Sequence, residues 1–231
     1  MNETTTKQRP VKFLAGTKQE NDTIFLCGVT GSGKTVLMSN LLHESNRDFV
    51  IVDTQAQFAE FPAVQAKSFQ DLVDALNHGH RRVVVGWPSF AWGDFDRVIL
   101  ILDEHQRRNP QMPAICVAVD EAAFFCEGNT CCGGLDHLIA RGRTVRLTKM
   151  FNTQWFNRLP PRVRDSATEI YIFHHRDKRA QEIFGEYGLT MDDLAELEPL
   201  ECFHVKGACV EKLELEPQKQ RQPAPMVAGR N

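Results

Sequence analysis

Short runs of apolar residues alternate along the chain with longer segments in which apolar residues recur at helical spacing. The short runs are rich in valine, isoleucine and phenylalanine, a pattern typical of buried strands in a parallel sheet. We therefore predict strands at 23–27, 49–52, 82–85, 115–119, 147–152 and 170–173. Two further short strands, 202–205 and 209–213, are expected to pair as a hairpin across Gly207 and Ala208.

The predicted helices fall between these strands. They cover 35–42, 69–77, 95–106, 135–140, 178–187 and 191–197. This alternation favours a three-layer α/β fold in which helices flank a mostly parallel central sheet. The 231 residues suffice for one such domain, which we place at 21–214. We expect residues 1–20 to form an arm or edge strand, and 215–231, rich in proline and glutamine, to form a flexible tail.

Composition changes this picture little. The net charge of -3 gives no overall reason to expect a nucleic-acid partner. The chain has no run of 18 or more apolar residues and no signal-peptide segment at its start, so we expect no membrane span and a location in the cytoplasm of the cell that makes it. The seven cysteines are odd in number and several stand in apolar runs, which predicts reduced thiols in a core.

The loop after the first predicted strand matches the phosphate-binding pattern G-x-x-x-x-G-K-[ST] in full and leads into a predicted helix. In this pattern the glycines let successive N–H groups face a phosphate, and the helix N-terminus adds partial positive charge. Lys34 would reach the β- and γ-phosphates of ATP, and the Thr35 hydroxyl would bind Mg²⁺. The residues expected to hold the nucleotide are Gly28, Val29, Thr30, Gly31, Ser32, Gly33, Lys34 and Thr35.

Polar residues at the ends of neighbouring strands supply the candidates for hydrolysis. Asp120 and Glu121 follow the strand at 115–119, where Asp120 would hold Mg²⁺ and Glu121 would act as general base; the alternative for Asp120 is a helix cap. Gln154 follows the strand at 147–152 and is either a sensor of the γ-phosphate or a loop amide. Asp53 ends the second strand and either organises water or caps a turn.

Positive charge is concentrated between residues 141 and 179. This segment predicts a polyanion contact or a charged subunit interface, with a solvated surface as the alternative. Arg141 and Arg143 stand just before the strand at 147–152. In ring-shaped ATPases an arginine of one subunit reaches the γ-phosphate held by its neighbour. We favour Arg143 over Arg141 for this catalytic role.

A cluster of cysteines follows the predicted acidic pair. Cys126, Cys131, Cys132 and nearby His137 do not have the paired spacing typical of zinc sites. We instead expect the segment 127–134 to be a flexible loop that faces a channel or a neighbouring subunit.

The order of these parts resembles the FtsK–HerA superfamily of DNA-pumping ATPases. The sequence GVTGSGKT is followed by VDTQAQF, VAVDEA, the segment ARGRTVRLTKMFNTQWFNRLPPRVRDSA and the strand EIYIFHHRD, over roughly residues 20–205. The resemblance implies a RecA/ASCE-like P-loop NTPase. It also implies nucleotide and sensor roles for Lys34, Thr35, Asp120, Glu121 and Gln154, and a trans-acting role for Arg141 or Arg143. The family works as hexameric rings that thread DNA.

The small size makes the chain most similar, within that superfamily, to genome-packaging ATPases of viruses with an internal membrane and a double-jelly-roll capsid. The expected function is an Mg²⁺-dependent ATPase motor that packages double-stranded DNA, working as a homo-oligomeric ring with partners at a capsid vertex or in the viral membrane. Its location would be the host cytoplasm or the packaging vertex of the virion. Alternatives are a HerA-like or conjugative translocase, a nucleotide-gated scaffold and a small-molecule P-loop kinase.

Overall fold

The computed structural model describes residues 22–45 and 47–215, so the predicted arm at 1–20 and the tail from 216 onward lie outside the described residues. Within the described part, nine strands form one sheet in the order β11-β10-β9-β1-β8-β5-β2-β4-β3. These strands are β1 (Thr23–Cys27), β2 (Asp48–Val52), β3 (Val64–Ala66), β4 (Arg82–Val85), β5 (Ile115–Val119), β8 (Leu147–Thr153), β9 (Glu169–Phe173), β10 (Glu201–Lys206) and β11 (Cys209–Glu214).

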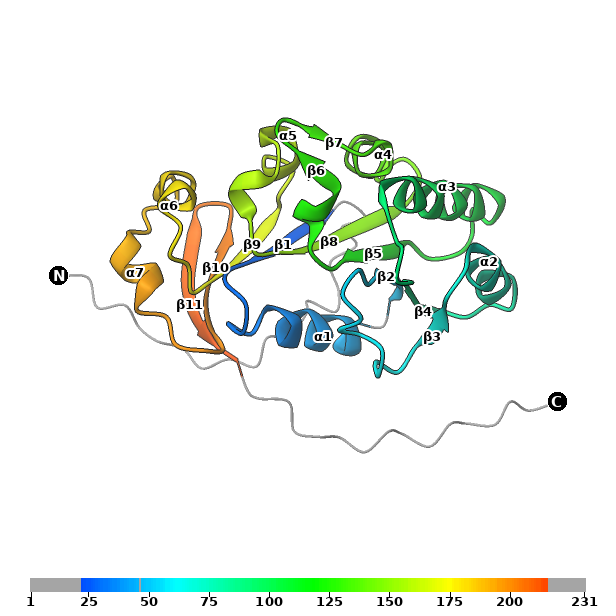
Figure 1. Cartoon of the computed structure of the whole chain (residues 1–231), viewed down its shortest axis with the longest axis horizontal. Helices are drawn as coiled ribbons and strands as arrows, with labels where there is room; N and C mark the ends of the chain where they lie inside the picture. The colour runs from blue at the N-terminus through cyan, green and yellow to red at the C-terminus, as the bar shows by residue number, and fades with distance from the viewer. Residues whose placement is uncertain (1–21, 46, 216–231) are drawn as a thin grey trace.

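Helices cover both faces of this sheet. They are α1 (Lys34–Glu44), α2 (Phe69–Asn77), α3 (Trp92–Arg108), α4 (Gly133–Arg141), α5 (Pro161–Arg164), α6 (Lys178–Gly185) and α7 (Met191–Ala195). In Figure 1, α1 lies on one side of the sheet, and α3, α4 and α5 lie on the other. The α/β fold with a mostly parallel sheet, predicted from the alternation of strands and helices, is confirmed.

Alternating residues of the strands point to opposite faces of the sheet and pack into two hydrophobic cores. Phe25, Val117 and Phe151 pack into the larger core with the α3–α4 side, whereas Ile24 and Met150 pack with α1. Because these strands are buried on both faces, they read as continuous apolar runs, which is why the sequence located them.

Strand β8 lies between β1 and β5, and all three run parallel. The register pairs Cys27 with Thr153 and Val119 with Phe151. The carboxyl ends of the three strands therefore meet at one edge of the sheet, where ligands bind in open α/β sheets.

Several short elements differ from the prediction. The edge strand β3 was not predicted, because three residues are too few to show a period. The prediction of a flexible loop at 127–134 is wrong: β6 (Cys126–Glu127) and β7 (Thr130–Cys131) pair as a small hairpin, and α4 begins at Gly133. The predicted pairing of the last two strands across Gly207 and Ala208 is confirmed, with Lys206 opposite Cys209.

Leu215, the first residue of the predicted tail, is buried, and its amide donates to the carbonyl oxygen of Leu200 (2.8 Å). The packed domain therefore extends to Leu215. No helix within the described ranges is long and apolar enough to cross a lipid bilayer.

A charged cluster ties β10 to β9. The Glu169 carboxylate accepts from Lys206 Nζ (2.5 Å) and contacts His204 Nε2 (3.1 Å), while His204 Nδ1 lies 3.2 Å from Glu211. Burial alone would raise the pKa of Glu169, but hydrogen bonds and charge from His204 and Lys206 lower it to about 2. Burial opposes the charge on His204, yet its hydrogen bonds to Glu169 and Glu211 raise its pKa above the usual value.

This cluster predicts an acid-sensitive contribution to stability. Since the pKa of Glu169 falls from 4.5 to about 2 on folding, its contribution is present above pH 4.5 and is lost as the pH falls toward 2. At about 1.4 kcal/mol per pKa unit, the loss is on the order of 3 kcal/mol. The His204 contribution has the opposite sign: it is present below pH 6.5 and is lost as the pH rises through the raised pKa.

The measurement is urea unfolding of the wild type and of Glu169→Gln at a series of pH values, with the exposed Glu60→Gln as matched control. The free-energy difference between wild type and Glu169→Gln should shrink as the pH falls from about 4.5 to 2. A difference that stays constant over this range would contradict the assignment.

Candidate nucleotide site

The loop from Gly28 to Thr35 joins β1 to α1 in a conformation that only glycine tolerates at two points. Gly28 and Gly33 have φ angles of 154° and 113°. A Cβ on Gly28 would lie 2.6 Å from the Cβ of Phe173, and one on Gly33 would lie 3.0 Å from the side chain of Leu200. No side chain caps the start of α1. The amides at this helix N-terminus therefore remain available to an anion.

Lys34 lies inside this loop rather than in solvent. Its Nζ donates to the carbonyl oxygen of Val29 (2.8 Å), an oxygen that also accepts from the Ser32 hydroxyl (2.8 Å). Burial lowers the pKa of Lys34, and the negative charges of Glu121 and Asp120 oppose this shift. The structure thus brings together the P-loop lysine and the two carboxylates that the sequence separates by more than 80 residues.

Two hydroxyls of the loop contact glutamines from other segments. Thr30 Oγ1 donates to Gln154 Oε1 (2.9 Å), and Thr35 Oγ1 donates to Gln57 Oε1 (2.9 Å). The structure places Gln154, the predicted sensor of the γ-phosphate that follows β8, beside the P-loop. Gln57 was not singled out, because it lies in the irregular part of the VDTQAQF segment after β2, where the sequence alone assigns it no role.

Asp120 directly follows β5 and is almost fully buried. Its Oδ1 accepts from the Asn152 side chain on the neighbouring β8 (2.8 Å), whereas its Oδ2 is buried without a partner among the described residues. Burial raises the pKa of Asp120 to about 6, assisted by the charges of Asp53 and Glu121 and opposed by Asn152 and Lys34. A buried carboxylate oxygen without a donor is costly and is suited to a cation.

Glu121 is held by the end of β8. Its Oε1 accepts from the Thr153 hydroxyl (2.9 Å), and its Oε2 accepts from the Gln154 amide (3.1 Å). The φ angle of Glu121 is 56°, a left-handed conformation that is uncommon for residues other than glycine and occurs at functional sites. Burial raises the pKa of Glu121, and the two hydrogen bonds and the charges of Lys34 and Arg158 oppose the rise.

Of the two alternatives predicted for Asp53, organising water or capping a turn, the structure shows turn capping. Its carboxylate accepts from the backbone amides of Gln57 (3.0 Å) and Phe58 (2.8 Å). It therefore caps the turn after β2, and this turn carries the Gln57 side chain to Thr35.

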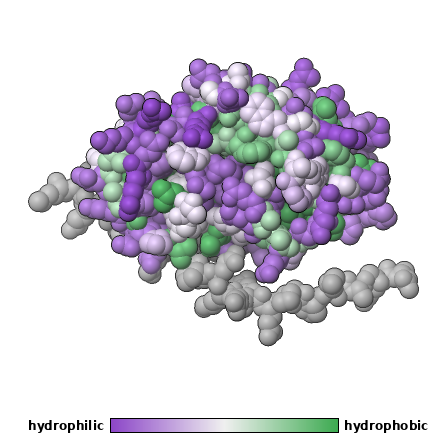
Figure 2. Space-filling view, in the orientation of Figure 1, coloured by the Kyte–Doolittle hydropathy of each residue, from purple (hydrophilic) through white to green (hydrophobic). Residues whose placement is uncertain are grey.

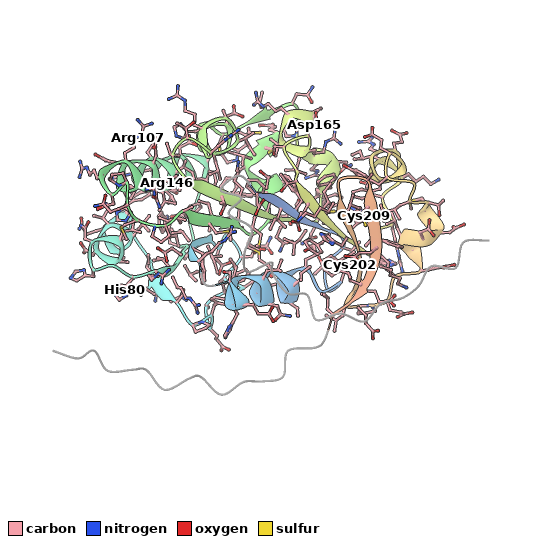
Figure 3. All side chains as sticks on the ribbon, turned by 180° about the vertical axis from the view of Figure 1, so that it is seen from behind. His80, Arg107, Arg146, Asp165, Cys202 and Cys209 are labelled. Atoms are coloured by element: carbon pink, nitrogen blue, oxygen red, sulfur yellow. The ribbon has the colours of Figure 1, made fainter. Side chains whose placement is uncertain are left out.

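The structure separates the three arginines that precede β8. Arg146 donates to Gln106 Oε1 (2.8 Å) and to the carbonyl oxygens of Asn109 (2.9 Å) and Met112. Arg146 thereby fixes the segment after α3. Figure 3 shows Arg146 near the end of α3, where Arg107 is labelled. Arg141 and Arg143 are exposed.

Arg141 and Arg143 stand at the opposite edge of the sheet from the P-loop. They precede β8, whose seven residues span roughly 23 Å between the two edges. The structure therefore does not bring either arginine to the nucleotide loop of its own chain.

Arg146→Ala should destabilise the protein. The substitution removes a charged donor from three oxygens, at a cost of about 2–3 kcal/mol. Arg141→Ala, on an exposed side chain of the same segment, should change the free energy of unfolding by less than about 0.5 kcal/mol. Chemical denaturation of both variants measures this, and equal stability of the two would show that the contacts of Arg146 contribute nothing.

Within the described part of the chain, no group of three or more His, Cys, Asp or Glu side chains is placed to hold a metal ion. His137 Nε2 instead contacts Asp103 on α3 (3.0 Å). Asn152, which holds Asp120, was not singled out from the sequence, and Thr153, which holds Glu121, was noted only within the segment that carries the family resemblance. The signal that marks them is a pair of polar residues at the end of an otherwise mostly apolar strand.

Comparisons with known proteins bear on the fold of the chain. The sequence matches no protein-family model and no curated protein. The fold, by contrast, matches many solved structures. The genome packaging NTPase B204 from Sulfolobus turreted icosahedral virus 2, in complex with AMPPCP, has a TM-score of 0.71 and 18% identity over 86% of this chain and 100% of that chain.

The chain has the fold of a P-loop ATPase. VirB4 of Thermoanaerobacter pseudethanolicus is similar with a TM-score of 0.65 at 10% identity, covering 88% of this chain and 91% of that chain. The bacterial conjugative coupling protein TrwB is similar with a TM-score of 0.60 at 11% identity, covering 88% and 87%. The P-loop NTPase fold inferred from the motifs is confirmed by these structural similarities.

Proposed function

We propose that the chain is a Mg²⁺-dependent ATPase motor that translocates double-stranded DNA and packages a viral genome into a preformed capsid. The observation that carries the ATPase assignment is the convergence of Lys34, Asp120 and Glu121 at the carboxyl edge of three adjacent strands. The similarity to B204, which is named a genome packaging NTPase, supports the choice of DNA packaging among possible functions of this fold.

The residues present fit a magnesium ion. A buried Asp120 oxygen without a donor and the Thr35 hydroxyl are oxygen ligands, and Mg²⁺ prefers one or two such groups together with water and substrate phosphates. When bound there, Mg²⁺ would supply positive charge that neutralises charge on the phosphates of the nucleotide. Asn152, through its hydrogen bond, orients the Asp120 carboxylate for this role.

The other roles follow from position. The phosphates are bound by backbone amides of the loop residues, which are Gly28, Val29, Thr30, Gly31, Ser32 and Gly33. When the nucleotide binds, the Lys34 side chain leaves the carbonyl oxygen of Val29 and contacts the β- and γ-phosphates. Glu121 is the general base that takes a proton from the attacking water, held in place by Thr153. Gln154 contacts both Thr30 and Glu121 and so senses the γ-phosphate.

In this proposal Arg143 acts on the nucleotide of a neighbouring copy, with Arg141 as the second candidate. Both are exposed and lie at the edge of the sheet opposite their own P-loop. The arrangement suits a closed ring in which each site is completed by the next subunit, and we infer a hexamer from the FtsK–HerA resemblance. Capsid-vertex or viral membrane proteins are the proposed docking partners.

The proposed function is tested by ATP hydrolysis with and without double-stranded DNA. The rate should rise several-fold with long duplex DNA, as expected when phosphate contacts bind the polymer to the motor. Lys34→Ala sets the background rate, and the exposed Lys67→Ala is its matched control. Hydrolysis that ignores DNA would contradict a translocase and favour the nucleotide-gated scaffold.

A conjugative translocase is the second candidate, because VirB4 and the conjugative coupling protein TrwB share the fold. The same assay with empty capsids separates the two. Stimulation by capsids as well as by DNA supports packaging, whereas stimulation by DNA alone supports the conjugative alternative.

A further inference from the structure

The hairpin of β6 and β7 carries two cysteines directly opposite each other. Cys126 and Cys131 are register partners, and their sulfur atoms lie 3.5 Å apart. The amide of Cys132 donates to the carbonyl oxygen of Phe125 (3.0 Å), which makes that neighbouring pair the hydrogen-bonded one. Cys126 and Cys131 therefore form a non-hydrogen-bonded pair, in which Cα atoms lie about 4.5 Å apart and side chains are closest.

This separation falls within the range of about 4.4–6.8 Å between the Cα atoms of disulfides. A disulfide between register partners needs only side-chain rotation and no movement of the strands. The pairing is also selective. Cys132 points to the other side of the hairpin and is buried, where it interacts with Asp96 of α3.

The pair is also within reach of small molecules. Cys126 and Cys131 are half-buried, whereas Cys27, Cys116 and Cys202 are buried in the core. In Figure 1 the hairpin lies at the upper edge of the molecule beside α5, and Figure 2 shows hydrophobic residues reaching the surface around it. Phe124, two residues before the hairpin, is 48% exposed.

We propose that Cys126 and Cys131 are a reversible dithiol–disulfide site that closes when the protein meets a peroxide. One thiol attacks the peroxide and becomes a sulfenic acid with release of water. The second thiol attacks that sulfur and expels a second water, so two thiols and one hydrogen peroxide yield one disulfide and two waters. A small dithiol reductant reverses the reaction by exchange.

The site stands apart from the nucleotide chemistry but is close to it along the chain. The segment from Ala122 to Phe125 connects Glu121 to the hairpin, and Cys126 Sγ lies 3.9 Å from the carbonyl oxygen of Ala122. A disulfide would close a ring of six residues, from Cys126 to Cys131, directly after this segment. The proposal does not depend on ATP hydrolysis, because its readout is chemical.

The experiment treats the full-length protein with hydrogen peroxide, blocks remaining thiols with an alkylating agent and maps peptides by mass spectrometry. We expect the loss of two titratable thiols and a peptide in which Cys126 is linked to Cys131, with full reversal by dithiothreitol. Cys126→Ser and Cys131→Ser should each abolish the linked peptide. Cys209→Ser, which removes an exposed cysteine from another strand, should leave it unchanged.

Three results would overturn the proposal. They are an unchanged thiol count in folded wild-type protein, a link from either cysteine to Cys132, and links between molecules through Cys209 in place of the internal bond. The wild-type map decides the question by itself, so the proposal remains testable even if a serine variant folds poorly.

Discussion

Arg143→Ala should lower the rate of ATP hydrolysis by about 10³–10⁵-fold, the range observed for arginines that stabilise the transition state of phosphoryl transfer. The residue is exposed at the edge of the sheet opposite its own P-loop, so the loss would arise at a neighbour's nucleotide. Nucleotide binding should change little, because the binding loop of each chain is intact. Steady-state hydrolysis and nucleotide affinity measure the two effects separately.

Mixed rings provide the decisive control. Lys34→Ala and Arg143→Ala should each be inactive alone, yet a Lys34→Ala subunit would still offer Arg143 to an Arg143→Ala neighbour. Assembled together at equal amounts, they should recover about a quarter of the wild-type rate, since half of the subunits keep an intact P-loop and half of those have an intact arginine beside them. No recovery would reject action between subunits. If Arg143→Ala alone stays active, the same mixing experiment is done with Arg141→Ala.

Glu121→Gln should lower hydrolysis by about 10²–10⁴-fold, the usual contribution of a general base. Glutamine has the same shape and its oxygen still accepts from Thr153 or from the Gln154 amide, so the turn should persist. What is lost is the ability to take a proton from water. ATP affinity should be retained or tightened, because a negative charge near the phosphates is removed.

Glu127→Gln makes the same chemical change on an exposed residue of the nearby hairpin and should leave the rate unchanged. Equal rates for wild type and Glu121→Gln would exclude Glu121 as the base. A loss of nucleotide binding in Glu121→Gln would instead assign it a role in holding the loop.

The sequence predicts the core of the fold well, because the central strands are buried on both faces. The run of β5 is wholly apolar, that of β1 is apolar after Thr23, and the P-loop between β1 and α1 is a local pattern. The positions of Lys34, Asp120 and Glu121 then follow from the rule that parallel strands present their carboxyl ends at one edge. Each of these inferences uses only neighbours in sequence or a general property of sheets.

What the sequence does not reveal depends on contacts between strands. Asn152 meets Asp120 and Thr153 meets Glu121 across 32 residues, and only the register of β5 against β8 brings them together. The wrong prediction for 127–134 has another cause: strands of two residues are too short to show alternation. The sequence cannot distinguish the roles of the three neighbouring arginines, because the structural role of Arg146 depends on its contacts with the segment after α3.

The central position of strand β8 in the sheet has a consequence for both of its ends. It is hydrogen-bonded to β1 on one side and to β5 on the other, and each of its seven residues is buried. Such a strand is stiff along its length, so its two ends shift together. In the proposed motor, one end would contact the groups that sense the γ-phosphate, and the other end would follow the arginines that act on the next copy. In a ring, β8 would thus couple the state of the nucleotide in one subunit to hydrolysis of the nucleotide in the next subunit. The order in which the subunits hydrolyse ATP would then depend on the position of this strand.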